Sequence, residues 1–315
     1  MRRHIVSIFA VVGVLLACTA FALVQQGGIS SGEAARPAEP QTILFIGNSF
    51  TLGMHSTVRK WRPESVSDLS GKQQGGVPAL FKSFTEQSGL DYTVSFDAEA
   101  GKSLAFHYEN CRKRFDHRWD VVVLQEYSQL DSKRPGDMAN YLRDTARLTA
   151  LFKAHDRFTQ VWLMPTWSRA DATYSPKGKW HGQSIDKMAL DLRAAADAAR
   201  RATSGITGII PVGEGWNRAF SSGVADADPY DGLTKGQVNL WAADNHHGSL
   251  AGYYLTALTV FGSITKVDPR SLGADEFAAS DLGLDPKLAV VLQRVAAEQL
   301  LANGVDFRSG GITSR

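Results

Sequence analysis

Five short apolar segments recur along this chain, and segments of helical character separate them. Each is too short for a helix, and together they are rich in β-branched and aromatic residues; they lie at residues 42–46, 92–96, 121–124, 160–164 and 206–210. Strands that are continuously apolar are buried on both faces, which is typical of a parallel sheet covered by helices on its two sides. The sequence therefore predicts an α/β fold, a three-layer αβα sandwich with a five-stranded parallel sheet of the flavodoxin-like type.

The segments between and after these strands supply the covering helices. Apolar residues recur there at helical intervals, over residues 78–87, 137–154, 185–201, 250–264 and 286–301. Residues 55–77 are polar and contain several glycines, so we expect a long insertion loop in this region. Because no internal repeat and no shift in composition divides the chain, residues 41–315 are predicted to form a single domain.

The N-terminus has the pattern of an export segment. Residues 1–24 begin with a basic stretch and continue as an apolar run with an Ala-x-Ala sequence at residues 20–22, and residues 25–40 have the composition of a flexible linker. Three interpretations remain open: a cleaved signal peptide, a retained membrane anchor, or lipidation at Cys18. In each of them the protein is exported, and it is periplasmic, secreted or anchored on the outer side of a membrane through this segment only.

The charge balance argues against nucleic acid as a partner, and the cysteine content argues against a zinc site built from cysteines. Lysine plus arginine number 34 against 32 for aspartate plus glutamate, so the chain lacks the concentrated basic excess that nucleic-acid binding needs. Cys18 and Cys111 are the only cysteines, so the predicted domain has no internal disulfide and no zinc site built from cysteines. Nothing in the sequence requires a metal or an organic cofactor.

A serine follows the first predicted strand directly. The strand ends in Gly47-Asn48-Ser49, and the carboxyl ends of strands are where open α/β sheets form their sites. A helix or turn after Ser49 would direct backbone N–H groups at developing negative charge. Taken alone, the segment is better explained by an ordinary turn capped by a polar side chain.

A second polar cluster lies just before the helix predicted at residues 250–264. Asp244 precedes His247 by three residues, so its carboxylate can bind imidazole Nδ1 and leave Nε2 available as a base. One alternative is a helix cap by Asp244 or Ser249, with the histidines in solvent. Another is a metal site of Asp244, His246 and His247. Adjacent histidines are expected to point in divergent directions, and the chain has no helical His-x-x-x-His pair, so we predict no metal site.

Together these two clusters resemble the SGNH (GDSL-like) hydrolases, and the resemblance extends over essentially the whole predicted domain. That family has its serine in a Gly-Asp-Ser or Gly-Asn-Ser block after the first strand and an Asp-x-x-His block before the last long helix. Ser49, Asp244 and His247 match both blocks in order and location. Many relatives have His-Pro-Ser where this chain has His-Gly-Ser at residues 247–249, which selects His247 over His246 as the base. The resemblance implies a Ser49–His247–Asp244 catalytic triad.

The resemblance also implies an oxyanion hole. The family uses a glycine after the second strand, where this chain has Gly101, and an asparagine side chain after the third strand, where this chain departs and has Gln125. The implied donors are the backbone N–H groups of Ser49 and Gly101 and the side chain of Gln125. If the resemblance is set aside, Gly101 is explained as an ordinary turn glycine and Gln125 as a capping side chain.

These residues predict a serine esterase that hydrolyses carboxylic esters through an acyl-enzyme. A small-molecule or carbohydrate ester is the expected substrate, because four aromatic residues on predicted loops could receive sugar rings; they are Trp167, Tyr174, Trp180 and Trp241. Aromatic side chains that anchor long loops explain the same residues. Two further functions fit the scaffold, an acyltransferase that passes the acyl group to a sugar and a catalytically inert polysaccharide-binding protein.

Overall fold

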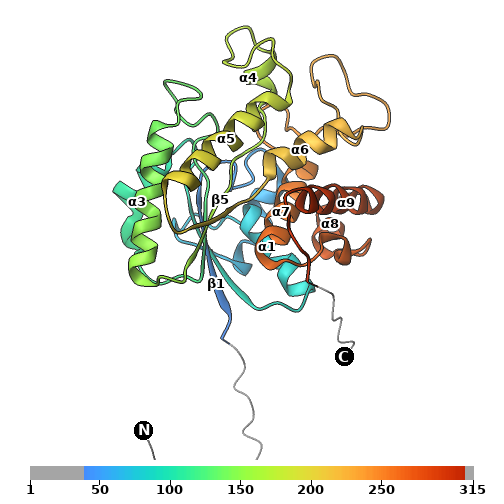
Figure 1. The fold of residues 1–315 in the computed structure, drawn as a ribbon. Helices are drawn as coiled ribbons and strands as arrows, with labels where there is room; N and C mark the ends of the chain where they lie inside the picture. The colour runs from blue at the N-terminus through green and yellow to red at the C-terminus, as the bar shows by residue number, and fades with distance from the viewer. Residues whose placement is uncertain (1–38, 309–315) are drawn as a thin grey trace, which may run out of the picture. The chain divides into compact units, whose positions relative to one another are not determined.

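A six-stranded parallel sheet forms the centre of the molecule (Figure 1). The computed structural model describes residues 39–308, and its strands lie in the order β2-β3-β1-β4-β5-β6. β1, which precedes Ser49, is hydrogen-bonded to β3 on one side and to β4 on the other, so it is a central strand. The strand bounds are β1 Gln41–Gly47, β2 Ser67–Asp68, β3 Tyr92–Ala98, β4 Val121–Leu124, β5 Gln160–Leu163 and β6 Ile206–Ile209.

The five predicted strands are all present, and one further strand lies at the edge of the sheet. Without β2, the order of the others in the sheet is second, first, third, fourth, fifth, which is the flavodoxin-like order. The prediction of five strands is therefore corrected to six. β2 was not predicted because it consists of only two polar residues, which pair with β3 and carry no apolar run.

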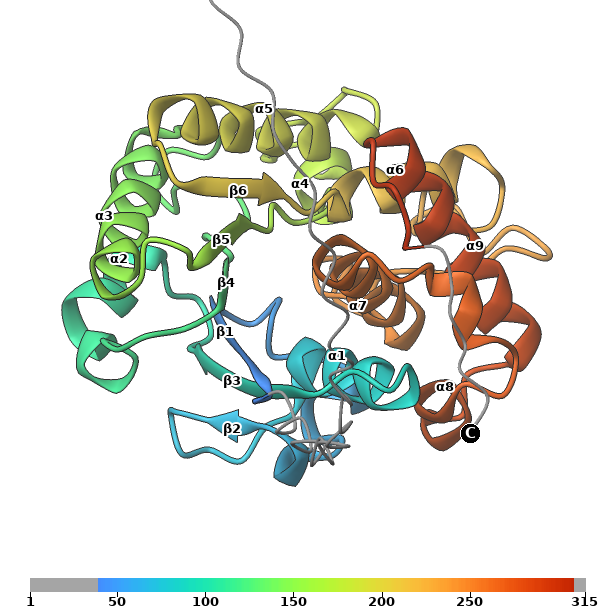
Figure 2. The same ribbon diagram turned by 60° about the horizontal axis from the view of Figure 1, so that its bottom comes forward.

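Helices cover both faces of the sheet, as predicted (Figure 2). The residues of β1 alternate between two cores: Ile43 and Phe45 pack against one set of helices, and Leu44 and Ile46 against the other. The first set comprises α1 Gly76–Gln87, α6 Val212–Ser221, α7 Leu250–Thr265, α8 Phe277–Leu282 and α9 Pro286–Ala302. The second comprises α2 Leu104–Phe106, α3 Ala139–His155 and α5 Asp186–Ala202.

The five predicted helices are found to within two residues at each end, and several short elements had no clear signal. α6 contains Gly213 and Gly215, which lower its helix propensity, and α8 has only six residues. The short helix α4, Ala170–Tyr174, follows β5. The predicted insertion loop at residues 55–77 contains β2 and two 3₁₀ turns, Thr57–Lys60 and Pro63–Ser65.

The predicted export segment at residues 1–24 lies outside the described residues, as does nearly all of the predicted linker at residues 25–40. Within residues 39–308, the helices are too short or too polar to cross a membrane. The parallel sheet places the ends of β1, β3 and β4 side by side. The loops that follow these three strands carry Ser49, Gly101 and Gln125, respectively.

Candidate active site

The turn that carries Ser49 is held by the side chain of Asn48, which is 1% exposed. Asn48 Oδ1 accepts a hydrogen bond from the N–H of Phe50 at 3.2 Å. Its Nδ2 donates to the carbonyl oxygens of Lys102 at 3.0 Å and Glu126 at 3.3 Å. Asn48 therefore joins the serine turn to the loops that follow β3 and β4.

A hydroxyl group on α7 and the tight packing at Gly47 also hold this turn. The hydroxyl of the buried Tyr253, on α7, donates to the carbonyl oxygens of Met54 at 3.1 Å and Ser49 at 3.4 Å. At Gly47 any Cβ would lie 2.2 Å from Thr51 Oγ1, so the side chain of Thr51 leaves room only for glycine. Ser49 itself is 8% exposed.

The loop before α7 holds His247 through Asp244. Asp244 Oδ1 accepts hydrogen bonds from the N–H groups of His246 (3.1 Å) and His247 (3.0 Å), and its Oδ2 lies 2.6 Å from His247 Nδ1. Asn245 takes the left-handed conformation, with a φ of 53°, which asparagine tolerates. The N-cap of α7 is Ser249, whose side chain accepts from the N–H of Gly252. Asp244 thus shapes the turn and orients the imidazole at the same time.

Ser49 and His247 line one cleft of about 340 Å³, together with His55, Gly101 and Tyr127. Because His247 Nδ1 is bonded to Asp244, Nε2 is the nitrogen left to receive a proton. That atom is buried and has no hydrogen-bond partner within residues 39–308. The structure therefore brings the predicted nucleophile and base to the same cleft without a direct hydrogen bond between them, a spacing common in unliganded enzymes.

The charges of this pair suit a neutral base beside an ionised carboxylate. Burial alone would raise the pKa of Asp244, but hydrogen bonds from the His247 ring and from two backbone N–H groups outweigh it and lower the pKa to about 2. Burial lowers the pKa of His247 below its ordinary value, against the opposing effect of Asp244. His247 is therefore neutral at physiological pH and able to accept a proton.

Two backbone donors of the predicted oxyanion hole lie at the cleft. Ser49 and Gly101 both line it, and Gly101 has a φ of 71°, a conformation that favours glycine. Within residues 39–308 the N–H groups of these two residues have no backbone or side-chain acceptor. Both donors are therefore available to a bound carbonyl oxygen.

The structure does not bring Gln125, the third predicted donor, into the cleft. Its side chain is 1% exposed, and its Nε2 donates to the carbonyl oxygen of Glu126. Its Oε1 accepts from the N–H of Asn48 at 2.9 Å and from Thr51 Oγ1 at 3.0 Å. The glutamine side chain thus holds the serine turn in place. In the SGNH hydrolases that the sequence resembles, the asparagine at this place is expected to face the substrate instead.

The four aromatic residues considered for sugar binding do not line the cleft either. Trp167, Trp180 and Trp241 are at most 2% exposed and belong to the core, and the half-buried Tyr174 donates its hydroxyl hydrogen to the carbonyl oxygen of Ala227. The indole N–H of Trp167 donates to the carbonyl oxygen of His246 at 3.1 Å. These residues therefore anchor the loops around the site, which was the alternative interpretation.

Two clusters have the side chains of a metal site, but hydrogen bonds engage both. His55, Asp244 and His247 place ligand atoms within 4.8 Å of one another, as do three buried residues, Asp97, His107 and Cys111. In the first cluster the short contact between Asp244 and His247 engages the carboxylate and Nδ1.

The expectation that His246 and His247 diverge was wrong. Their rings stack in parallel, with centroids 4.2 Å apart and an angle of 3° between planes.

Two residues near the predicted triad were not identified from the sequence. His55 has a left-handed backbone, with a φ of 62°, and its Nε2 lies 3.6 Å from Asp244 Oδ2. Glu126 is 5% exposed and adjoins the cleft behind Tyr127. No local pattern marked His55, a single histidine in a polar region far from Asp244 in sequence. The signal for Glu126 was a carboxylate two residues after a buried strand, at the edge of the sheet where sites form.

Comparisons with known proteins find similarity in structure but not in sequence. No family model and no curated protein sequence matches it. A DUF4886 family protein from Bacteroides uniformis has a similar structure, with a TM-score of 0.58 and 18% identity over 86% of this chain and 98% of that one. An acetylxylan esterase from Geobacillus stearothermophilus, Axe2, matches at a TM-score of 0.44 and 16% identity over 70% of this chain and 92% of its own.

A third solved structure, TesA, matches at a TM-score of 0.43 and 18% identity, over 71% of this chain and 98% of that chain. At such identities the comparisons show the fold alone. The strand order, the helices on both faces and the match to the DUF4886 family protein agree with the sequence prediction. The chain therefore has the three-layer αβα sandwich of the flavodoxin-like type that the resemblance to the SGNH (GDSL-like) hydrolases implies.

Proposed function

We propose that this protein is a serine esterase that hydrolyses carboxylic esters, with Ser49 as nucleophile, His247 as general base and Asp244 as the residue that orients His247. One observation carries the proposal: Ser49 shares a cleft with an imidazole whose Nδ1 is held at 2.6 Å by a carboxylate and whose Nε2 is unpartnered in the described residues. A serine, an oriented base and paired backbone donors are the components of acyl transfer.

In the proposed mechanism His247 Nε2 takes the proton of Ser49 Oγ while Oγ attacks the ester carbonyl carbon. The N–H groups of Ser49 and Gly101 stabilise the negative charge that develops on the carbonyl oxygen. The imidazolium then gives its proton to the leaving alcohol, and an acyl-enzyme forms. Water, deprotonated by His247, releases the acid and restores Ser49.

A second cavity, of about 160 Å³, suggests the character of the alcohol. It shares Gly101 and Tyr127 with the catalytic cleft, and its lining includes the polar side chains of Lys102, Asp131 and Asn140 beside three apolar residues. Such a mixture of donors and acceptors suits an alcohol rich in hydroxyl groups. This cavity, and not the buried tryptophans, supports the carbohydrate-ester form of the proposal.

Export is a further part of the proposal and rests on the sequence pattern of residues 1–24. Expression of the full chain followed by cell fractionation and N-terminal mass spectrometry tests it. An exported product that lacks residues 1–24 supports a cleaved signal, and a cytoplasmic, unprocessed product contradicts export.

Hydrolysis of p-nitrophenyl acetate by the full chain tests the catalytic proposal. We expect Ser49→Ala and His247→Ala to lower turnover by at least about 10⁴-fold, because the members of a triad act as a unit. Circular dichroism checks that both variants are folded.

His246→Ala is the matched control, because it removes the neighbouring ring and leaves the Asp244–His247 pair intact. It should keep most of the turnover. Comparable activity in Ser49→Ala and wild type would contradict the proposed nucleophile.

A further inference from the structure

Glu126 is a buried carboxyl group that connects two loops of the site. It follows Gln125 at the end of β4 and is 5% exposed. Both of its oxygens accept from the N–H of Leu104 at 3.3 Å, and Oε1 also accepts from the N–H of Tyr127 at 2.6 Å. Leu104 is the first residue of α2 and lies three residues after Gly101. The carboxyl group therefore ties the loop that carries Gly101 to the loop after β4.

The backbone of Glu126 extends this connection to the serine turn. Its carbonyl oxygen accepts from Asn48 Nδ2 at 3.3 Å, and the same Nδ2 donates to the carbonyl oxygen of Lys102 at 3.0 Å. The loops that carry Ser49, Gly101 and Tyr127 are thus joined through two buried residues, Asn48 and Glu126. Both proposed oxyanion donors lie on the loops that this network holds.

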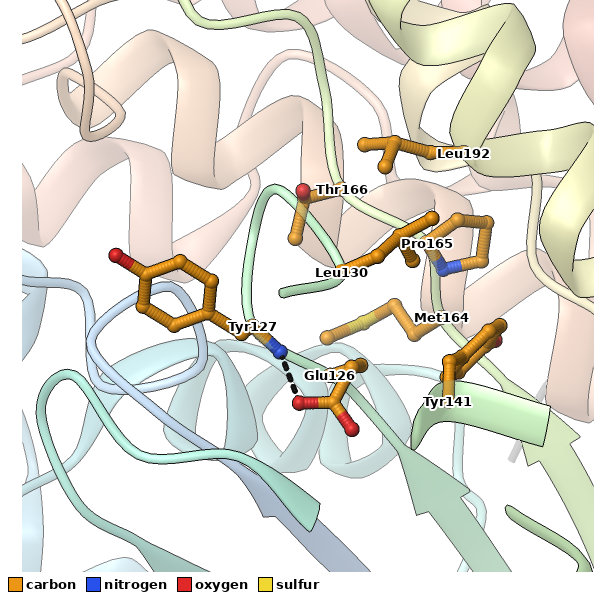
Figure 3. Close-up of a pocket in the computed structure, with 8 residues that line it drawn as sticks. All are labelled: Glu126, Tyr127, Leu130, Tyr141, Met164, Pro165, Thr166 and Leu192. Carbon is orange, nitrogen blue, oxygen red and sulfur yellow. Dashed lines mark hydrogen bonds between the residues drawn. The ribbon is translucent and has the colours of Figure 1, made fainter. Parts of the chain in front are cut away.

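The carboxyl group of Glu126 serves as a hydrogen-bond acceptor and not as an ion-pair partner. Within the described residues it forms no salt bridge. Glu126 lines a cavity of about 10 Å³, enough for about one water molecule. Figure 3 shows it with Tyr141, Met164 and Thr166, which also line this cavity. Burial raises the pKa of Glu126 to about 8, although the two backbone N–H groups oppose the rise.

We propose that Glu126 is a positioning residue, which fixes the Gly101 loop so that the Gly101 N–H faces the reacting carbonyl oxygen. This inference rests on the proposed esterase function. Glu126 does not line the catalytic cleft and acts through Gly101. Without its side chain, the N–H groups of Leu104 and Tyr127 lose their acceptor and the loop shifts, which displaces one of the two oxyanion donors.

Three variants of the full chain test this role by steady-state kinetics with p-nitrophenyl acetate. Glu126→Ala should lower kcat roughly 10- to 100-fold with KM changed less than about threefold, because a displaced oxyanion donor weakens transition-state binding more than substrate binding. Glu126→Gln should restore kcat to within about threefold of wild type, because an amide oxygen at the Oε1 position can accept from both N–H groups.

Glu276→Ala is the matched control. Glu276 is also a buried glutamate that accepts from two backbone N–H groups, those of Ala278 and Ala279, but it caps α8 away from the cleft. This variant should lose stability and keep kcat. Equal losses of kcat in the Glu276 and Glu126 alanine variants, unchanged kcat in Glu126→Ala, or no recovery in Glu126→Gln would each overturn the inference.

Hydrogen exchange gives a second readout that does not depend on turnover. The peptide covering residues 99–106 should exchange faster in Glu126→Ala than in wild type and at the wild-type rate in Glu126→Gln. Unchanged exchange in Glu126→Ala would overturn the positioning role. An inactive wild-type chain that shows the expected exchange pattern would instead count against the proposed esterase, so the two failures are distinguishable.

Discussion

Among the described residues, two histidines are hydrogen-bonded through Nδ1 to an aspartate at nearly equal distances, and of these two pairs only one lies at the cleft that contains Ser49. Asp244 and His247 are 2.6 Å apart, and Asp97 and His107 are 2.7 Å apart. In both pairs the histidine Nε2 is buried without a partner among the described residues. The geometry of the pair alone therefore does not distinguish a catalytic base from a structural histidine.

The difference lies in access and in the other partners of the aspartate. The side chains of Asp97 and His107 are each 1% exposed, and Arg114 binds the second oxygen of Asp97 at 2.8 Å. Asp244 is 30% exposed, and His247 shares its cleft with Ser49. Asp97 lies on β3, and His107 begins the π-helical turn His107–Cys111. A serine in the same cleft, and not the Asp–His contact, therefore distinguishes the proposed catalytic pair from the buried one.

Substitution of each aspartate by asparagine gives the largest expected contrast. Asp244→Asn should lower kcat by roughly 10³- to 10⁴-fold, because asparagine cannot stabilise the imidazolium or hold the required tautomer. Asp97→Asn should leave kcat within about threefold of wild type and lower the unfolding free energy. Kinetics with p-nitrophenyl acetate and urea unfolding measure the two effects. A large loss of kcat in Asp97→Asn with the fold intact would remove the proposed distinction.

Removal of the buried imidazole should affect stability alone. His107→Ala should lower the unfolding free energy by about 2–4 kcal/mol, because it leaves a cavity and deprives Asp97 of a buried hydrogen bond. Turnover per folded molecule should remain unchanged. Urea denaturation with active-site titration separates the two quantities. A stability equal to that of wild type would show that the buried pair contributes little to the fold.

The pairs should also respond to acid in different pH ranges. Burial lowers the pKa of His247 below its ordinary 6.5, so kcat/KM should fall with decreasing pH around a midpoint below 6.5. Burial opposes ionisation of Asp97, but His107 and Arg114 hold its pKa below 3.8. Its contribution to stability is therefore present above 3.8 and is lost as the pH falls through the lowered pKa. A kcat/KM midpoint above 6.5 would contradict the environment described for His247.

The fold was largely predictable from the sequence because the patterns that indicate strands and helices are local. Apolar runs such as residues 121–124 and helices with regular apolar spacing are readable one segment at a time. β2 and α8 are too short to carry such a signal, and they depend on their neighbours in space.

The site was predictable only where the residues that contact each other lie within one short segment of the sequence. Asp244 and His247 lie three residues apart, so their contact could be anticipated, whereas Asp97 and His107 belong to different elements. The orientation of Gln125 depends on packing against Gly47 and Thr51, and the sequence does not encode this locally. His55 approaches Asp244 only after the chain has folded.

The smallest expected effect concerns Cys111, which completes a buried Asp97–His107–Cys111 cluster. Burial raises the pKa of its thiol, and the nearby Asp97 raises it further, so the reactive thiolate is disfavoured. Iodoacetamide should not label Cys111 in the native protein within hours, as read by peptide mass spectrometry that separates it from Cys18. Cys111→Ala should keep esterase turnover and cost about 1 kcal/mol of stability. Rapid labelling, or a loss of turnover with the fold intact, would show that the Asp97–His107 pair activates the Cys111 thiol as a nucleophile despite its burial.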